Sequence, residues 1–287
     1  MDESASGSAN FSLLASRRPP WSAAAAKLPA PSDAGSTLAA VQGDYARRGV
    51  AEFIGTFTLM FIAAGSIMVG SGGLIGVAVA QGLAIALMVT AFGHISGGHF
   101  NPAITLGFLV TRRITLALAG VYWLVQFGGA VVASLLLWWI FPADAVAPAR
   151  LGAPLLHPSI GSGAGFALEA IMTFFLVITV FATAVDDRGA FKAVAGFGIG
   201  LVLTMDILCG GPLTGAAMNP ARAFGPELVY NVWESYTWIY YAGPVVGAIL
   251  AAVLYEVLYL QPKMRLPLPG RPGADVDEPR PGDLAAS

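Results

Sequence analysis

Long apolar stretches alternate with short polar segments along most of this chain. A helix that crosses a bilayer needs about 20 mostly apolar residues. Two more apolar segments, which begin after Asn101 and after Asn219, are too short to cross, and each covers about half of the membrane depth. Six stretches are long enough to cross: residues 51–70, 74–93, 116–140, 164–185, 191–209 and 236–260. The pattern predicts an all-α membrane protein with six transmembrane helices and two half-helices.

The composition agrees with this membrane assignment and excludes several functions. Hydrophobic residues make up 56% of the chain and charged residues only 11%, whereas soluble domains carry about 25% charged residues. The net charge of −2 gives no reason to expect a nucleic-acid partner. The single cysteine and the three scattered histidines do not form a metal cluster, and no nucleophile–base pair is evident. We therefore expect no metal site and no enzymatic activity.

The two ends of the chain differ from its middle. Residues 1–49 are rich in Ala, Ser and Pro without sustained periodicity, which predicts a disordered cytosolic tail. A transit peptide is the alternative, and Asp2 and Glu3 argue against it. Residues 261–287 are rich in proline and predict a second disordered cytosolic tail. Residues 50–260 then form the membrane domain.

The membrane domain contains an internal repeat, about residues 50–140 and 164–260. The segment "EFIGTFTLMF" from Glu52 matches "EAIMTFFLVI" from Glu169, and "YWLVQFGGA" from Tyr122 matches "YYAGPVVGA" from Tyr240. Asn-Pro-Ala occurs once in each half, and the offsets of these landmarks are 117 or 118 residues. Each half has three spans, an odd number, so the second half must enter the membrane inverted. The sequence predicts an inverted repeat of three plus three spans.

The positively charged residues predict the orientation of the spans. Thirteen of the 15 Lys and Arg residues fall on one side of the predicted spans, and only Arg150 and Arg222 fall on the other. Because cytoplasmic loops carry an excess of Lys and Arg, both termini are expected in the cytoplasm.

Each half-helix begins at an Asn-Pro pair that follows an irregular segment. Asn caps the free N–H groups of a helix and Pro suits its first position. The segments "SGGHF" and "TGAAM" precede the two pairs, and irregular backbone at membrane depth is tolerated where it lines a wet cavity. Inversion brings both helix N-termini together near the midplane, where the Asn amides are expected to point into a lumen. The backbone carbonyls expected to line it belong to Gly97, Gly98, His99, Gly215, Ala217 and Met218.

These motifs resemble the aquaporin (major intrinsic protein) family. The resemblance covers about residues 50–260 and is carried by "SGGHFNPA" and "GGPLTGAAMNPARAFGP". It implies a six-helix channel with one pore per subunit, a homotetramer in the lipid bilayer, no cofactor, and passage of water without protons or ions. The pore motif residues are Asn101, Pro102, Ala103, Asn219, Pro220 and Ala221.

The resemblance also predicts a selectivity constriction. Arg222 matches the constriction arginine of the family, and the other three positions fall on Gln81, Ile207 and Ala216. Strict water channels usually have Phe and His in place of Gln81 and Ile207. The segment "DILCGGPLTGAAMNPARAFGPE" is most similar to plant tonoplast intrinsic proteins and the aquaporin-8 group, which implies water and often ammonia or hydrogen peroxide. Gln81, commonly His there, and Glu227, commonly Ala, depart from that pattern.

Several ionisable residues have more than one interpretation. Glu52 and Glu169 occupy matching positions, and we expect them to support the irregular segments as hydrogen-bond acceptors, with a proton relay as the alternative. Asp206 has three interpretations: it supports the constriction, pairs with Arg222, or is an ordinary hydrogen-bonded acid. His157 either lies in solvent or dips into the mouth of the pore.

Two other functions compete with a water channel. A glycerol facilitator of this family typically has Asp after the constriction arginine and Pro-Leu in the last span, whereas here Ala223 and Tyr240-Tyr241 occupy these places. A junctional membrane protein with a vestigial pore is the other alternative, although both Asn-Pro-Ala motifs are intact. The sequence predicts a passive channel for water and small neutral solutes such as ammonia or hydrogen peroxide.

Overall fold

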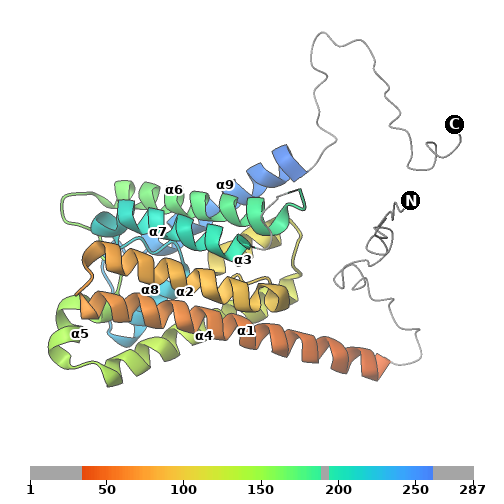
Figure 1. Cartoon of the computed structure of the whole chain (residues 1–287), viewed down its shortest axis with the longest axis horizontal. Helices are drawn as coiled ribbons and strands as arrows, with labels where there is room; N and C mark the ends of the chain where they lie inside the picture. The colour runs from red at the N-terminus through yellow and green to blue at the C-terminus, as the bar shows by residue number, and fades with distance from the viewer. Residues whose placement is uncertain (1–33, 189–193, 261–287) are drawn as a thin grey trace, which may run out of the picture. The chain divides into compact units, whose positions relative to one another are not determined.

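The computed structural model of the protein describes residues 34–188 and 194–260. All regular secondary structure in these residues is helical, and residues from Tyr45 onward belong to one compact unit (Figure 1). In chain order the helices are α1 (Ala34–Val69), α2 (Gly73–Ser96), α3 (Pro102–Val110), α4 (Leu116–Ile140), α5 (Ala143–Ala149), η3 (Arg150–Gly152), α6 (Ser162–Val180), η4 (Phe181–Val185), α7 (Ala195–Thr214), α8 (Pro220–Val229), α9 (Ile239–Tyr255) and η6 (Glu256–Leu260).

Six of these helices are long and apolar enough to cross a membrane, which confirms the predicted number of spans. They comprise residues 42–69, 73–96, 116–140, 162–185, 195–214 and 239–260, where η4 continues α6 and η6 continues α9. The fifth span extends to Thr214 rather than residue 209: α7 continues through Pro212 and ends at the left-handed Gly215. The two half-helices are α3 and α8, each with Pro at its start.

The tail predicted for residues 1–49 is too long. Helix α1 begins at Ala34, so residues 34–49 are helical and that part of the prediction is wrong. These residues include Ala, Leu, Gln and Arg, which favour a helix. Charged residues and glycines interrupt the apolar run among them, so the length of apolar stretches does not reveal this part of the helix. Residues 1–33 and the predicted tail at 261–287 lie outside the described residues.

Glycines at matching places in the two halves bring the helices together. Extensive packing joins α2 to α7 and α6 to α9. Gly82 of α2 and Gly200 of α7 are 118 residues apart, and each packs against the other's backbone carbonyl, so a side chain at either would collide with its partner helix. Gly129 of α4 packs against the backbone of Phe53, and its repeat mate Gly247 of α9 against that of Ala170. The contact between repeat-related glycines is what an inverted repeat requires at its two-fold axis.

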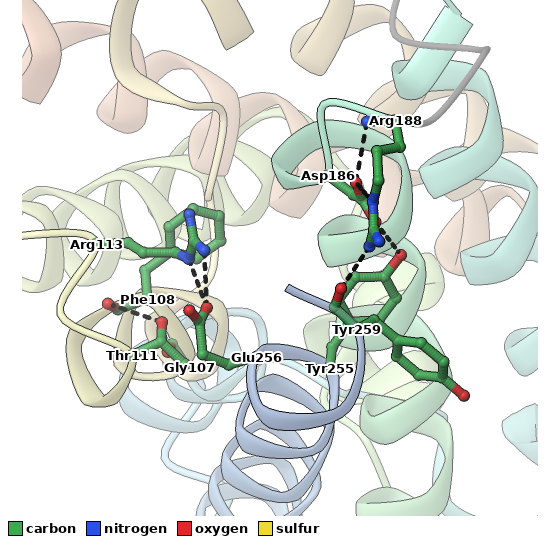
Figure 2. Close-up of polar contacts among 9 residues, drawn as sticks. All are labelled: Gly107, Phe108, Thr111, Arg113, Asp186, Arg188, Tyr255, Glu256 and Tyr259. Atoms are coloured by element: carbon green, nitrogen blue, oxygen red, sulfur yellow. Dashed lines mark hydrogen bonds and ion pairs between the residues drawn. The ribbon is translucent and has the colours of Figure 1, made fainter. Parts of the chain in front are cut away.

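Polar side chains connect the helices at the end of the bundle that carries Arg113, which is called the Arg113 end here. Arg113 pairs with Glu256 at 2.8 Å, and Arg188 pairs with Asp186 at 2.7 Å (Figure 2). The hydroxyl of Tyr255 donates to Asp186, and Arg188 donates to the carbonyl of Tyr259. The C-terminal end of α9 is therefore fixed to the segments that follow α3 and α6. The opposite end, which carries α5, is called the α5 end.

Candidate functional site

Two buried glutamates hold the irregular segments that precede the half-helices. Glu52 of α1 accepts from the backbone N–H of His99 at 2.9 Å and of Phe100 at 2.6 Å, one on each carboxylate oxygen. Ser96 and Gln126 donate to the same carboxylate through their side chains. Because both oxygens are fully engaged and the side chain is buried, Glu52 is positioned to shape the first segment.

The second repeat uses the same arrangement. Glu169 of α6 accepts from the backbone N–H of Ala217 at 2.9 Å and of Met218 at 2.7 Å, again one on each oxygen. Thr214 donates to it through its hydroxyl at 2.7 Å, as Ser96 does to Glu52. This repetition of donors favours a supporting role for both acids over a proton relay.

The two irregular segments also share their backbone conformation. Gly97 and Gly215 are left-handed, with φ of 94° and 82°, and end α2 and α7. Phe100 and Met218 are left-handed as well, with φ of 50° and 51°. These four residues form two pairs with the 118-residue offset. The carboxylates bond to the backbone N–H groups and so leave backbone carbonyls available to other partners.

Asn101 and Asn219 cap the half-helices and also join them. The side-chain oxygen of Asn101 accepts from Ala103 N–H at 2.8 Å, and that of Asn219 accepts from Ala221 N–H at 3.0 Å. The amide of Asn101 donates to the carbonyl of Met218 at 2.8 Å, and that of Asn219 donates to the carbonyl of Phe100 at 2.9 Å. The expectation that the whole amide points into a lumen thus needs correction. One N–H of each amide binds the opposite segment, and one N–H remains.

A narrow cavity passes between the two Asn residues. Its polar lining comes from both Asn residues, Gln81, Arg222 and residues of the two irregular segments, which are Gly98, His99, Ala217 and Met218. The rest of the lining is apolar and comes from α1, α2, α3, α6 and α7: Leu59, Ile85, Val89, Ile104, Leu176, Ile199 and Leu203. Such a lining offers a small solute a single line of hydrogen-bonding partners along otherwise apolar walls.

Further cavities adjoin this one on both sides. Toward the α5 end, Gln81 and Arg222 also line the next cavity, together with Ile207 and Gly215. Toward the Arg113 end, Val89 lines the central cavity and a cavity that includes His94 and Gly97. Because successive cavities share residues, they mark a route that runs from one end of the bundle to the other.

Arg222 lies at the boundary between two of these cavities. Its side chain is buried, and its Nη1 donates to the carbonyl of Gly152 at 2.9 Å. Within the described residues its Nε and Nη2 have no hydrogen-bond partner, and the residue lines both cavities. The sequence contains no local signal for Gly152, which lies in the segment after α5 and reaches Arg222 only in the folded chain.

The four predicted constriction residues do not all meet. Gln81, Ile207 and Arg222 line the cavity toward the α5 end, but Ala216 lines neither cavity that Arg222 lines. Ala216 is left-handed, with φ of 45°, and its side chain belongs to the hydrophobic core. Its neighbours Gly215 and Ala217 line the two cavities instead. Leu155, which belongs to the segment after α5 and is also absent from the predicted site, lines the same cavity as Gln81.

The remaining candidates have different surroundings. His99 is buried, its Nδ1 lies 3.1 Å from the Thr105 hydroxyl, and its ring packs on Phe108 and Tyr122. His157 is exposed, bonds to Ser159 and does not line the cavity toward the α5 end.

Asp206 is buried, and its Oδ2 has no hydrogen-bond partner within the described residues. The carboxylate lies within electrostatic range of Glu169, and no hydrogen bond or ion pair between Asp206 and Arg222 occurs in the part of the chain that the structure describes. Of the three interpretations of Asp206, the direct pairing with Arg222 is therefore the one that the described contacts do not support.

Six spans, two Asn-capped half-helices and a route between them define a multi-pass integral membrane protein of the channel class. A family model described as "Major intrinsic protein" matches residues 39–255, well over half of the chain. The chain belongs to the major intrinsic protein family.

Individual relatives agree with this assignment. The chain is 42% identical to Aquaporin TIP4-4 of Zea mays over 78% of this chain and 90% of that protein. It is 46% identical to Probable aquaporin TIP3-2 of Oryza sativa subsp. japonica over 76% and 83% of the two chains, and 39% identical to Lens fiber major intrinsic protein of Gallus gallus over 81% and 90%. The solved structure of the aquaglyceroporin from Plasmodium falciparum shares the fold, with a TM-score of 0.63 at 24% identity, and covers 75% of this chain and 96% of that one.

Proposed function

We propose that this protein is a passive water channel that excludes protons and ions. The observation that carries the proposal is the meeting of two Asn-capped half-helices at the centre of a narrow, mostly apolar route. The aquaporin relatives support water as the substrate. The family consists of channels, and no chemical reaction is proposed for this chain.

Proton exclusion follows from the field at the midpoint of the route. Each half-helix N-terminus is equivalent to about +0.5 elementary charge, and the remaining amide N–H groups of Asn101 and Asn219 are donors. A water molecule there turns its oxygen toward both donors and its hydrogens away from them. The hydrogen-bonded water chain then reverses its polarity at the centre, so a proton cannot hop through it. The same positive field opposes cations.

Arg222 supplies a second barrier toward the α5 end. Its side chain lines the route, and its charge repels cations where the route narrows. Gln81 and Ile207 complete this constriction with one amide and one apolar side chain. The amide of Gln81 has both an acceptor and donors, which suits ammonia or hydrogen peroxide as well as water. These two solutes are part of the proposal, and glycerol is not.

The proposal includes the assembly and the orientation of the protein. A homotetramer is proposed from membership of the family, with one pore in each subunit. Both termini are proposed to lie in the cytoplasm, because basic residues gather at the Arg113 end: Arg48 and Arg113 line one cavity there, and Arg113 and Arg188 both contact the C-terminal end of the last span.

Reconstituted vesicles test the function directly. The full chain is placed in liposomes that contain a pH-sensitive dye and is exposed to an osmotic step in a stopped-flow instrument. We expect shrinkage many times faster than in empty liposomes, with no faster loss of an imposed pH gradient. Water flux equal to that of empty liposomes, or a pH gradient that collapses through the protein, would refute the proposal.

A further inference from the structure

A cavity beside the water route at the Arg113 end has the chemistry of an anion site. Arg48 of α1 and Arg113 line it, and neither arginine lines the cavities of the route. Thr115 and His94 also line it and add a hydroxyl and an imidazole. Its volume of about 890 Å³ lies within the roughly 300–1,000 Å³ of small-ligand sites. None of the described residues that line this cavity is acidic, so it presents positive charge and hydrogen-bond donors.

Arg113 has one acidic partner outside the cavity. Its Nε and Nη2 both contact the Oε2 of Glu256 in η6, at 2.8 Å each (Figure 2). This contact fixes the guanidinium but does not use Nη1. Because a guanidinium carries donors on all three nitrogens, Arg113 can bind an anion while it keeps Glu256.

An apolar groove between α1 and α4 begins beside this cavity. Its lining comes from Tyr45, Ala46, Gly49, Val50 and Phe53 of α1 and from Val121 and Val125 of α4. The helices approach closely at Gly49, where a Cβ atom would lie 3.3 Å from Val121. Val50 is 58% exposed, so the groove is open at the surface of two spanning helices. In a bilayer such a surface faces acyl chains.

The groove and the basic cavity lie on two sides of the same contact between α1 and α4. Arg48 of the cavity and Gly49 of the groove are consecutive residues of α1. The hydroxyl of Tyr45, which lines the groove, lies 3.4 Å from the hydroxyl of Thr115, which lines the cavity. A single elongated ligand can therefore reach both.

The chemistry changes in a definite order toward the Arg113 end. Phe53 is the deepest groove residue of α1, and Tyr45 lies about two turns nearer that end, where it meets Thr115 at the start of α4. Arg113 precedes α4, and the side chain of Arg48 reaches the same cavity. Apolar residues, then hydroxyl groups, then cations follow the order of acyl chain, ester and phosphate in a phospholipid.

Two other occupants compete for this surface, and each accounts for only half of it. A free phosphate ion would use the arginines but has no apolar part for the groove. A second copy of the chain would cover the groove but brings no phosphate to the cavity. A lipid with an anionic headgroup uses both parts, and basic cavities at membrane boundaries suit such headgroups.

We propose that the basic cavity and the groove together bind one anionic phospholipid. Arg48 and Arg113 hold its phosphate, and one acyl chain lies along the groove between α1 and α4. The Arg113 end is the end proposed to face the cytoplasm, whose leaflet carries the anionic lipids. This inference goes beyond the proposed water channel and does not depend on water flux.

Native mass spectrometry of the full chain in detergent tests the headgroup. Phosphatidylglycerol and phosphatidylcholine with the same acyl chains are added in equal amounts, and we expect several-fold more phosphatidylglycerol to stay bound. Arg48→Gln and Arg113→Gln should each reduce this preference several-fold. Glu256→Gln breaks the same ion pair but keeps Arg113, so it should retain the preference. Equal binding of the two lipids by the unaltered chain would overturn the proposal, and so would equal losses in Glu256→Gln and Arg113→Gln.

Two matched variants of α1 test the groove. Val50→Trp fills the groove and should lower the amount of bound phosphatidylglycerol several-fold. Val69→Trp adds the same side chain at the other end of α1, where Val69 is 59% exposed, and should leave binding unchanged. Equal effects of the two variants would overturn the proposal.

The same spectra identify the competing occupants. Glycerol phosphate, a headgroup without acyl chains, should not displace the lipid; displacement would indicate a site for free anions and overturn the proposal. Loss of subunit assembly in Val50→Trp with unchanged lipid binding would assign the groove to a second copy and overturn it as well. Failure of the water-channel proposal would appear as absent water flux and would leave these lipid masses unchanged.

Discussion

Replacement of Glu169 by Gln should destabilise the second irregular segment. The two carboxylate oxygens accept one backbone N–H each, from Ala217 and from Met218. The amide of Gln has a single acceptor oxygen, so in either orientation one of these N–H groups faces an NH2 group and loses its partner. The hydroxyl of Thr214 can rotate and accept instead of donating, so its bond survives in both orientations.

The structure sets the size of the expected effect. A hydrogen bond to a charged group contributes about 1.5–3 kcal/mol. Glu169→Gln removes one such bond, whereas Glu169→Ala removes both backbone bonds and the bond from Thr214. We therefore expect a loss of unfolding free energy of about 1.5–3 kcal/mol for Gln and at least twice that for Ala. Glu52→Gln should cost a similar amount, because His99 and Phe100 donate to separate oxygens of Glu52 in the same way.

Unfolding free energy in mixed micelles and water permeability in liposomes measure these effects. Glu234→Gln is the control, since it removes an exposed carboxylate of the same chain. Permeability should fall together with stability, because Met218 and Ala217 line the central cavity. If Glu169→Gln unfolds like the unaltered chain and conducts water equally well, the supporting role is wrong. A fold-neutral variant that changes only proton movement would instead favour the proton relay.

Three further predictions concern the route and the Arg113 end. Asn219→Asp keeps the helix cap but places an anion at the centre, so conductance recordings should show weaker cation exclusion; a variant as cation-tight as the parent would contradict the electrostatic argument. Ile207→His combined with Gln81→Phe should reduce ammonia and hydrogen peroxide flux in liposomes while water flux persists, and unchanged flux of all three would remove these residues from selectivity. Hydrogen bonds from Arg188 hold the pKa of the Asp186 carboxyl below its usual value, so this contact stabilises the fold above about pH 3.9 and is lost as the pH falls further. Asp186→Asn should therefore lower the thermal midpoint at neutral pH, and the difference from the parent should shrink toward about pH 3; a constant difference would contradict this.

The main elements of the fold could be predicted because each depends on a short, continuous stretch of sequence. An apolar run of sufficient length forms a spanning helix wherever lipid surrounds it, since its backbone groups must be satisfied within the segment. Asn followed by Pro starts a helix through bonds that reach only two or three residues, as at Asn101 and Asn219. The start of α1 at Ala34 escaped the same reasoning, because its first turns mix Ala, Leu and Val with Gly, Ser, Thr and charged residues and so contain no apolar run of spanning length.

The repeat allowed one long-range feature to be predicted as well. An odd number of spans per half requires inversion, and inversion brings the two half-helices together. The approach of Gly82 to its repeat mate Gly200 follows from the same symmetry, although the sequence alone did not identify that pair. Because symmetry relates the two halves, the meeting of the half-helices could be predicted without knowing how the side chains pack.

Only the tertiary structure decided how the site is completed. The bond from Arg222 to Gly152 joins parts of the chain that lie far apart in sequence, and so do the bonds from the amides of Asn101 and Asn219 to the opposite segments. The position of Ala216 in the core depends on its left-handed backbone. Side-chain packing across helices determines such contacts, and no local pattern of residue types encodes the partner. The sequence by itself determined which segments enter the membrane and where two helices begin at its centre, whereas packing determined which atoms face the solute.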